Sequence, residues 1–310
     1  MENCALTGVK QWRDDVFVTV PRWKRGVPAT LARVVTVGGK PLLEPFPSWQ
    51  MNAIGDPNAL QYVQSMEIDT HGRMWIVDVG RLNIFDAPES VVNGPPKLIL
   101  LDIATRRVLQ TFVFPHDVAA WNSSFLNDVA VDEPRGFAYI SDASGSGGVV
   151  VYDLNKNRAR RWSGPGTAVE SGVLLNISGK TYDFRTPSGT FRALSNCLGE
   201  LLTIGAAADG IALSPDSERV YYCPLLGFHL WSVPASLLRD FAAPAAAISA
   251  AAVDHGKKAS QTDGMAFDAR GTLYFGLLSL DGINKWTPPA PLTTQEALLP
   301  RDPATLQWFA

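Results

Sequence analysis

Five polar residues stand at the same position of a repeated sequence unit, and their types suit the binding of a charged or polar ligand. Each one precedes a segment of alternating apolar residues, and two of them are carboxylates. Polar groups of this kind are costly to bury alone, so they would bond to one another, to water, to a cation or to a ligand. The five residues are Thr7, Gln64, Asn127, Asp209 and Asp263.

Two further interpretations of these residues follow from their chemistry. Asn127, Asp209 and Asp263 offer carboxylate and amide oxygens, which are the ligands that Ca²⁺ takes, so they are candidate metal ligands. Glycines follow both aspartates, at 210 and 264, and allow a close backbone approach. The Asp-Gly pairs also suit turns that tie neighbouring repeats together, and this structural interpretation stays open.

Acid–base chemistry has weaker candidates. His116 lies in the segment before Asn127, and Asp128 directly follows it; both are candidate catalytic residues. A Gly-x-Ser-x-Gly elbow and a Cys/His nucleophile pair are not legible in the sequence, so enzymatic activity stays open.

Recognition of an amine would need a carboxylate together with aromatic faces around the cation. Asp209 and Asp263 are the carboxylate candidates for this role. Each aromatic candidate also suits packing in the core, which is the more common use of such residues. The aromatic candidates are Trp49, Phe125, Tyr222 and Phe228.

The repeat that carries these residues predicts the fold. Its first positions, 7, 64, 127, 209 and 263, are 57, 63, 82 and 54 residues apart. Each unit contains an apolar-alternating strand, a polar turn and a second strand rich in Val, Ile and aromatic residues, which indicates an all-β β-propeller rather than a β-sandwich. We expect one domain over residues 1–310, with about five full units. The second strands are expected at 16–20, 74–78, 137–141, 220–222 and 273–276.

Composition excludes several classes of protein. The chain of 310 residues has a net charge of −3 and no long run of one sign, which argues against a nucleic-acid partner. Its apolar runs are shorter than the roughly 18 residues of a membrane helix, so we expect no membrane partner. A signal peptide is not legible at the start of the sequence. Three cysteines allow at most one internal disulfide: Cys4, Cys197 and Cys223.

Longer motifs resemble a known family. VFVTVPRW at 16–23 and GVPATL at 26–31 are similar to the opening of the yellow / major royal jelly protein family. The resemblance extends over essentially all 310 residues. Further matches follow in order at 45–52, 72–80, 95–98, 124–129, 139–142, 230–234 and 301–308.

The resemblance implies a six-bladed propeller that is secreted and often glycosylated. It implies binding of biogenic amines in some members and conversion of dopachrome in others. Because the innermost strands of a propeller line its central channel, we expect a small aromatic or amine ligand to bind there. Sequons at Asn122 and Asn176 are compatible with extracellular glycosylation. Family members continue beyond the motif that ends at Trp308, so we expect the last blade to be incomplete and the chain to be a fragment at both ends.

A second resemblance bears on the metal. The Asn and Asp residues on successive repeats are similar to the metal site of gluconolactonase-type propellers, which use an additional glutamate. Glu67 is the nearest candidate for that glutamate. Three hypotheses therefore stand: a propeller that binds an aromatic amine, a tautomerase or cyclase acting on reactive aromatics, and a metal-dependent hydrolase of the lactonase kind.

Overall fold

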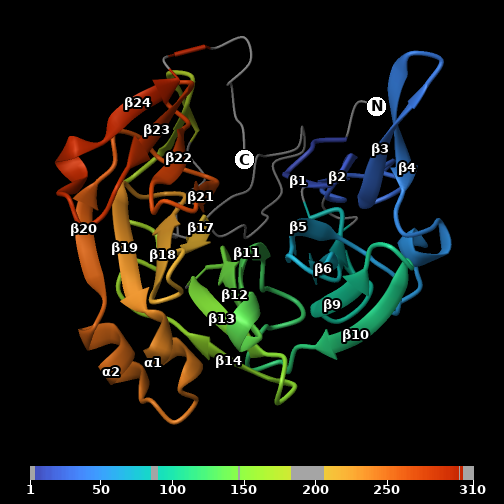
Figure 1. Ribbon diagram of the computed structural model, residues 1–310, viewed down its shortest axis with the longest axis horizontal. Helices are drawn as coiled ribbons and strands as arrows, with labels where there is room; N and C mark the ends of the chain where they lie inside the picture. Colours follow the sequence, from blue (N-terminus) through green and yellow to red (C-terminus); the bar gives the residue numbers. More distant parts are fainter. Residues whose placement is uncertain (1–3, 85–89, 146, 183–205, 300, 303–310) are drawn as a thin grey trace. The chain divides into compact units, whose positions relative to one another are not determined.

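The computed structural model describes residues 4–84, 90–145, 147–182, 206–299 and 301–302. Within these ranges the chain forms five four-stranded sheets that follow one another along the sequence (Figure 1). In four of them, neighbouring strands are consecutive in the chain; in the second, a short hairpin is inserted between two paired strands. Successive four-stranded sheets of this kind are the blades of a β-propeller.

The first two sheets lie in the first of two compact units, which spans the described residues up to Val129. The first sheet contains β1 (Gly8–Trp12), β2 (Asp15–Thr19), β3 (Leu31–Val37) and β4 (Lys40–Pro45). The second sheet contains β5 (Val63–Ile68), β6 (Arg73–Asp78), β9 (Lys97–Asp102) and β10 (Arg107–Val113).

The second unit holds the described residues from Ala130 onward, and β11 crosses the boundary between the units. The third sheet contains β11 (Leu126–Asp132), β12 (Phe137–Asp142), β13 (Gly148–Asp153) and β14 (Arg158–Trp162). The fourth contains β17 (Ala208–Leu213), β18 (Arg219–Pro224), β19 (His229–Pro234) and β20 (Val253–Lys257). The fifth contains β21 (Met265–Phe267), β22 (Leu273–Leu277), β23 (Gly282–Trp286) and β24 (Glu296–Leu299).

The remaining elements are short. Two-stranded sheets form from β7 (Arg81–Leu82) with β8 (Val91–Val92) and from β15 (Leu175–Ile177) with β16 (Lys180–Tyr182). The helix α1 (Ala235–Arg239) begins directly after Pro234, and α2 (Ala245–Ala250) lies in a run of alanines. The structure also contains the 3₁₀ helices η1 (Gln50–Asn52), η2 (Glu133–Arg135) and η3 (Leu292–Thr294). Over the described ranges, every helix is too short to cross a bilayer.

The number of blades differs from the expectation. The six-bladed prediction is wrong, because the described residues form five four-stranded sheets. The last of these is complete, since β24 pairs with β23. The tail at 303–310, expected to lack its sheet, lies outside the described residues, and the single-domain assignment stays a prediction.

An aromatic residue stands at the equivalent position of the second strand in every blade, and it helps to explain why these segments become inner strands of a sheet. Four of the five are at most 3% exposed, and the fifth, Tyr274, is half-buried. Large flat side chains bury much apolar area, so this position anchors the first four blades in their cores. The five residues are Phe17, Trp75, Tyr139, Tyr221 and Tyr274.

Candidate functional site

A cluster of four polar side chains gathers on the first strands of the first unit; we call it the first-strand cluster, and it consists of Lys10, Ser65, Glu67 and Asp128. Lys10 lies on β1, Ser65 and Glu67 on β5, and Asp128 on β11. The Lys10 ammonium contacts the Glu67 carboxylate at 2.7 Å. The Ser65 hydroxyl donates to the Asp128 Oδ1 atom at 2.7 Å. Three strands that are distant in sequence therefore supply one ammonium and two carboxyl groups to one place.

Electrostatics make the Asp128 carboxyl unusual. Burial raises the pKa of Asp128 to about 6, although the Lys10 charge and the hydrogen bond from Ser65 oppose the rise. For Lys10, burial lowers the pKa, but the Glu67 and Asp128 charges outweigh this and the net change is upward. Asp128 is thus a half-buried carboxyl that changes charge near neutral pH.

Next to this cluster on β5, the side chain of Gln64 ends a short chain of hydrogen bonds. The Trp23 Nε1–H donates to the Tyr62 hydroxyl at 2.5 Å, and that hydroxyl donates to Gln64 Oε1 at 2.9 Å. Phe125 packs edge-on against Tyr62, with ring centroids 6.1 Å apart. Tyr62 thus occupies the Gln64 oxygen, which leaves the Nε2 atom as the hydrogen-bond donor of this amide. The amide lies beside an aromatic group formed by Trp23, Tyr62 and Phe125.

The segments that carry the family motifs hold this aromatic group in place. Arg22 is 2% exposed, and its guanidinium donates to the backbone carbonyls of five residues: Val27, Pro28, Asn52, Leu60 and Gln61. Burial lowers the pKa of Arg22 to about 10. The Asn52 amide accepts from the backbone N–H groups of Thr30 and Leu31 and donates to two carbonyls. These two side chains tie the β2–β3 loop to the segment between β4 and β5, and so they position Trp23 and Tyr62.

In the first unit, the predicted ring residues Thr7 and Gln64 are brought together, but through the Gln64 backbone. The hydroxyls of Thr7 and Thr19 both donate to the Gln64 carbonyl, at 2.8 and 2.9 Å. Asn127 is 5% exposed on β11. The contacts of Thr7 therefore tie β1 to β5, in line with the structural interpretation of the repeat.

In the second unit, Asp209 and Asp263 lie on neighbouring chain segments. The Ser141 hydroxyl donates to the Asp209 carbonyl at 2.5 Å. A Cβ atom on Gly210 would lie 2.4 Å from the Asp263 carbonyl oxygen, so a glycine is required there, as the sequence suggests. Asn127 belongs to the first unit and both aspartates to the second. Metal binding by these three residues, and their convergence with Thr7 and Gln64 into one ring, stay predictions.

The other predicted side chains have different surroundings. Among the aromatic candidates, Phe125 joins the group around Tyr62, whereas Tyr222 is fully buried against Trp162. Trp49 is 64% exposed, and Phe228 is half-buried. His116 is exposed, and its Nδ1 accepts from the Trp121 backbone N–H at 3.3 Å. The structure does not bring His116 into the first-strand cluster, so only Asp128 of the two catalytic candidates lies there.

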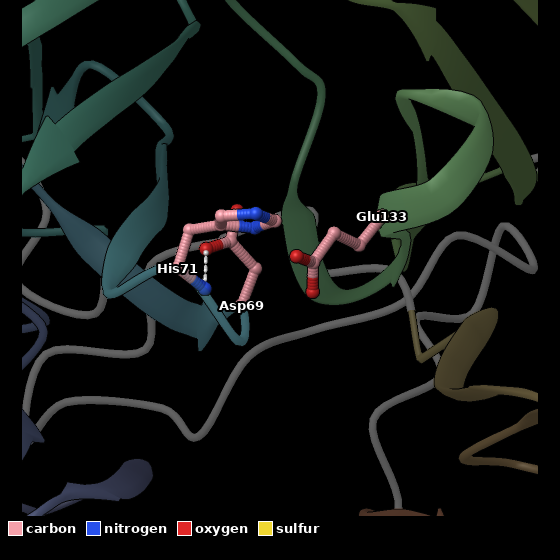
Figure 2. Close-up of side chains that lie close together, drawn as sticks. All are labelled: Asp69, His71 and Glu133. Carbon is pink, nitrogen blue, oxygen red and sulfur yellow. Dashed lines mark hydrogen bonds between the residues drawn. The ribbon is translucent and has the colours of Figure 1, made fainter.

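One aspartate outside the prediction, Asp69, is committed to a turn. Its Oδ1 accepts from the backbone N–H groups of His71 and Arg73, each at 3.0 Å, and its Oδ2 accepts from the side chains of Arg73 and Trp75. Figure 2 shows the bond from His71. Glu133, which is also drawn there, belongs to the second unit. The bonds of Asp69 shape the β5–β6 hairpin.

The two sequons differ in exposure. Asn122 is exposed in the loop before β11. Asn176 is half-buried on β15, where its Nδ2 donates to the Thr181 hydroxyl at 3.4 Å. A glycan is attached through that nitrogen, so Asn122 is the more accessible acceptor of the two. Of the cysteines, Cys4 and Cys223 are free thiols, and Cys197 lies outside the described residues.

The sequence singled out Asp128 as a catalytic candidate and Glu67 as a candidate metal ligand, but it gave no role to Lys10 or Ser65, which join them. Lys10, Ser65 and Glu67 lie one or three residues after the ring position of their repeats, where the later repeats have Gly or Ala. A comparison of these two positions across the five repeats shows that their polar residues lie in the first three repeats.

Comparison with known proteins gives a consistent family. The family model described as "Major royal jelly protein" matches residues 61–310. Protein yellow of Drosophila melanogaster is 26% identical over 309 residues, which is 95% of this chain and 53% of the relative. Protein yellow of Drosophila subobscura is 30% identical over 77% of this chain and 40% of the relative. Major royal jelly protein 3 of Apis mellifera is 28% identical over 73% of this chain and 38% of the relative. The chain thus spans about half or less of the length of these relatives.

Solved structures share the fold at low sequence identity. A chain of a nidogen/laminin complex superposes with a TM-score of 0.54 and 10% identity, covering 98% of this chain and 82% of that one. A luciferin-regenerating enzyme gives 0.53 at 12% identity, with 96% and 77% covered. A gluconolactonase from Xanthomonas campestris gives 0.51 at 12% identity, with 96% and 76% covered. Similarities at this level of identity establish the fold alone.

Proposed function

This chain belongs to the major royal jelly protein family, and we propose that it is an extracellular binding protein for a small aromatic amine, held at the first-strand cluster. The observation that carries the proposal is the charge of that cluster. It has two carboxyl groups, Glu67 and Asp128, and one ammonium, Lys10, which contacts Glu67. With Asp128 ionised the cluster has a net charge of −1, which a cationic ligand would balance.

Aromatic side chains close to the cluster favour a ligand with an aromatic ring. Gln64 precedes Ser65 on β5, and its amide lies beside Tyr62, which packs on Phe125. Aromatic rings bind planar groups and stabilise cations over their faces. The Gln64 Nε2 donor would take a hydroxyl or carbonyl oxygen of the ligand. A hydroxylated aromatic amine satisfies all three features.

Extracellular location and glycosylation are proposals of the same kind. They rest on the family and on the exposed sequon at Asn122. Expression in a secretory host and mass spectrometry of the released chain would test both, and an unmodified Asn122 would refute glycosylation there.

The binding proposal is tested by calorimetry with three probes of similar shape and different charge: tyramine, p-cresol and 4-hydroxyphenylpropionate. We expect saturable binding of tyramine alone. The substitutions Asp128→Asn and Glu67→Gln should each weaken tyramine about tenfold or more, a loss of about 1.4 kcal/mol. Asp117→Asn, which removes an exposed carboxylate in the same unit, is the matched control. Equal binding of the three probes, or no binding, would refute the proposal.

A second candidate function is favoured by the pKa of Asp128. A carboxyl that titrates near 6 is suited to general acid–base catalysis at neutral pH. We therefore keep, as the alternative, a tautomerase or cyclase that acts on reactive quinonoid aromatics. Its test is the rate of dopachrome decay with the wild-type chain and with Asp128→Asn. An inflection near pH 6 that disappears in the variant supports it, and equal rates refute it.

The lactonase-like alternative requires a cation at Asn127, Asp209 and Asp263. Its test is calorimetry with Ca²⁺ after treatment with a chelator, on the wild-type chain and on Asp263→Asn. Binding of Ca²⁺ that is lost in the variant would support this alternative, whereas no binding would remove it.

A further inference from the structure

One histidine, His255, lies where the fourth blade packs on the fifth, and it contacts aromatic rings of both. It is half-buried on β20 of the fourth blade. Its imidazole stacks on Tyr221 of β18, with ring centroids 5.3 Å apart and an interplanar angle of 24°. The ring of Trp286, on β23 of the fifth blade, lies 5.2 Å from the imidazole. All three residues belong to the second unit, so the imidazole is part of the packing between two blades of one unit.

The hydrogen bonds of a neighbouring hydroxyl, that of Ser232 on β19, show which form of the imidazole fits. The Arg219 Nε–H group donates to the Ser232 Oγ atom at 2.9 Å. The Ser232 hydroxyl keeps its own hydrogen for a second partner, and the His255 Nε2 atom lies 2.7 Å from Oγ. In this arrangement Nε2 is the acceptor, which requires a neutral imidazole with its hydrogen on Nδ1.

A proton on Nε2 would break this arrangement. The Nε2 atom would become a donor, so the Ser232 oxygen would accept from two cationic groups and its own hydrogen would lose its acceptor. Ser232 is fully buried. A buried hydroxyl that loses its partner costs free energy, so the charged imidazole fits this position poorly.

The groups packed around the imidazole add to this preference. Burial lowers the pKa of His255, the Arg219 charge on β18 lowers it further, and the Asp254 charge on β20 opposes both. From the fifth blade, Trp286 contacts the imidazole and Phe267 of β21 contacts the Tyr221 ring, and both side chains are uncharged. The helix η3, which packs on β20, also consists of uncharged residues.

We propose that His255 makes the packing of the fifth blade on the fourth sensitive to pH, so that acid loosens the contact. The unfolded chain takes up the proton at the ordinary histidine pKa of 6.5, and the folded chain does so only at lower pH. The stabilisation by neutral His255 is therefore present above pH 6.5 and is lost as the pH falls through the lowered pKa of the folded chain. This dependence is opposite in sign to that of Asp128, which lies in the other unit.

The test is hydrogen exchange of the backbone amides of β21, β22 and β23 at pH 7 and pH 5, expressed as protection relative to an unstructured chain. In the wild-type chain, protection of these strands should fall about threefold or more at pH 5. His255→Gln keeps a neutral acceptor for the Ser232 hydroxyl, so its protection should be the same at both pH values. His116→Gln, which removes an exposed histidine of the first unit, is the matched control and should behave as the wild-type chain does.

Two further measurements keep the proposal testable if His255→Gln folds poorly, which its melting temperature at pH 7 will show. The His255 imidazole, followed by NMR in the wild-type chain, should titrate with a midpoint below 6.5. Ser232→Ala removes the hydroxyl but keeps the imidazole, and it should reduce the loss of protection at pH 5. A midpoint at or above 6.5, equal protection of the wild-type chain at the two pH values, or an equal loss in His255→Gln would overturn the proposal.

Discussion

Equivalent positions on the first strands of the two units carry different side chains. Three residues after the ring position, the first unit has Lys10 and Glu67, whereas the second has Ala130, Ala212 and Ala266. One residue after it, β1 has Gly8, but Ser65 and Asp128 in the first unit contrast with Gly210 and Gly264 in the second. The first strands of the repeats are therefore of two kinds. Some carry charged or hydroxyl side chains, and others carry small residues that let neighbouring backbones approach closely.

The contrast teaches how one repeat serves two purposes. Where the side chain is absent, the neighbouring backbone comes close, as at Gly210 and the Asp263 carbonyl. Where a polar side chain is present, it reaches the next first strand, as Ser65 reaches Asp128. The inner strands of the second unit are therefore expected to be sensitive in stability, and those of the first unit in binding and pH response.

The largest effect on stability is expected for Gly210→Ala. The new Cβ would lie 2.4 Å from the Asp263 carbonyl oxygen and 3.0 Å from the Met265 methyl group, and a backbone atom cannot move aside cheaply. We expect a loss of about 2–3 kcal/mol in the free energy of unfolding, measured by denaturant titration. A loss below about 0.5 kcal/mol would show that the close approach is not required.

Asp128→Asn should raise stability, and only at higher pH. The pKa of Asp128 lies at about 6 in the folded chain and near 3.8 when unfolded. The stabilisation of the folded chain by the protonated carboxyl is therefore fully present below pH 4 and is lost as the pH rises through 6, where the buried carboxyl becomes charged. This displacement corresponds to up to about 3 kcal/mol, which partial solvent screening reduces to about 1–2 kcal/mol. Unfolding curves at pH 4 and pH 8 should therefore separate the variant from the wild-type chain at pH 8 alone. A difference that is the same at both pH values would contradict the assignment.

Gly8→Ala is the matched test of the glycine comparison in the first unit. Its Cβ would lie 2.7 Å from the Thr19 hydroxyl, a side-chain atom that can rotate away. Rotation would sacrifice the hydrogen bond from Thr19 to the Gln64 carbonyl, at a cost of about 1 kcal/mol. If Gly8→Ala proved as damaging as Gly210→Ala in the same titration, the distinction between the two units would fail.

The smallest stability effect belongs to Lys10→Gln. The Lys10–Glu67 pair is about one-third exposed, so its loss should cost about 0.5 kcal/mol. Because the Lys10 charge lowers the pKa of Asp128, the variant should raise that pKa further. Carboxyl chemical shifts followed over pH by NMR would measure the change. An unchanged Asp128 titration would place Lys10 outside the cluster.

The sequence predicted the repeat well because the second strands are apolar, aromatic and bounded by turns; all five were found. The outermost strands are harder to predict from the sequence. For example, β10 and β24 are largely exposed and lack the apolar alternation that indicates a strand. The expectation for Gln64 and Asp209 concerns their side chains, yet the backbone carbonyls of both residues accept hydrogen bonds, from Thr7 and Ser141. A sequence does not show whether a position acts through its backbone.

Arg22 could not be foreseen for a different reason. Arginine is normally exposed, and only the three-dimensional arrangement shows backbone carbonyls converging on this guanidinium. The motif at 16–23 identifies the family from its residue types. Its physical role follows from the contacts of Arg22, which fix the loops that position Trp23 and Tyr62.

Binding of tyramine measured by calorimetry at pH 5, 6, 7 and 8 tests the central proposal most directly, with the wild-type chain and Asp128→Asn in parallel. An ionised Asp128 is required to pair with the amine, so the wild-type affinity should be constant above pH 7 and fall up to about tenfold per pH unit below 6. The variant should bind weakly and with no dependence on pH over this range. Tight binding that is the same in both proteins, or a wild-type affinity that rises as the pH falls, would contradict the account.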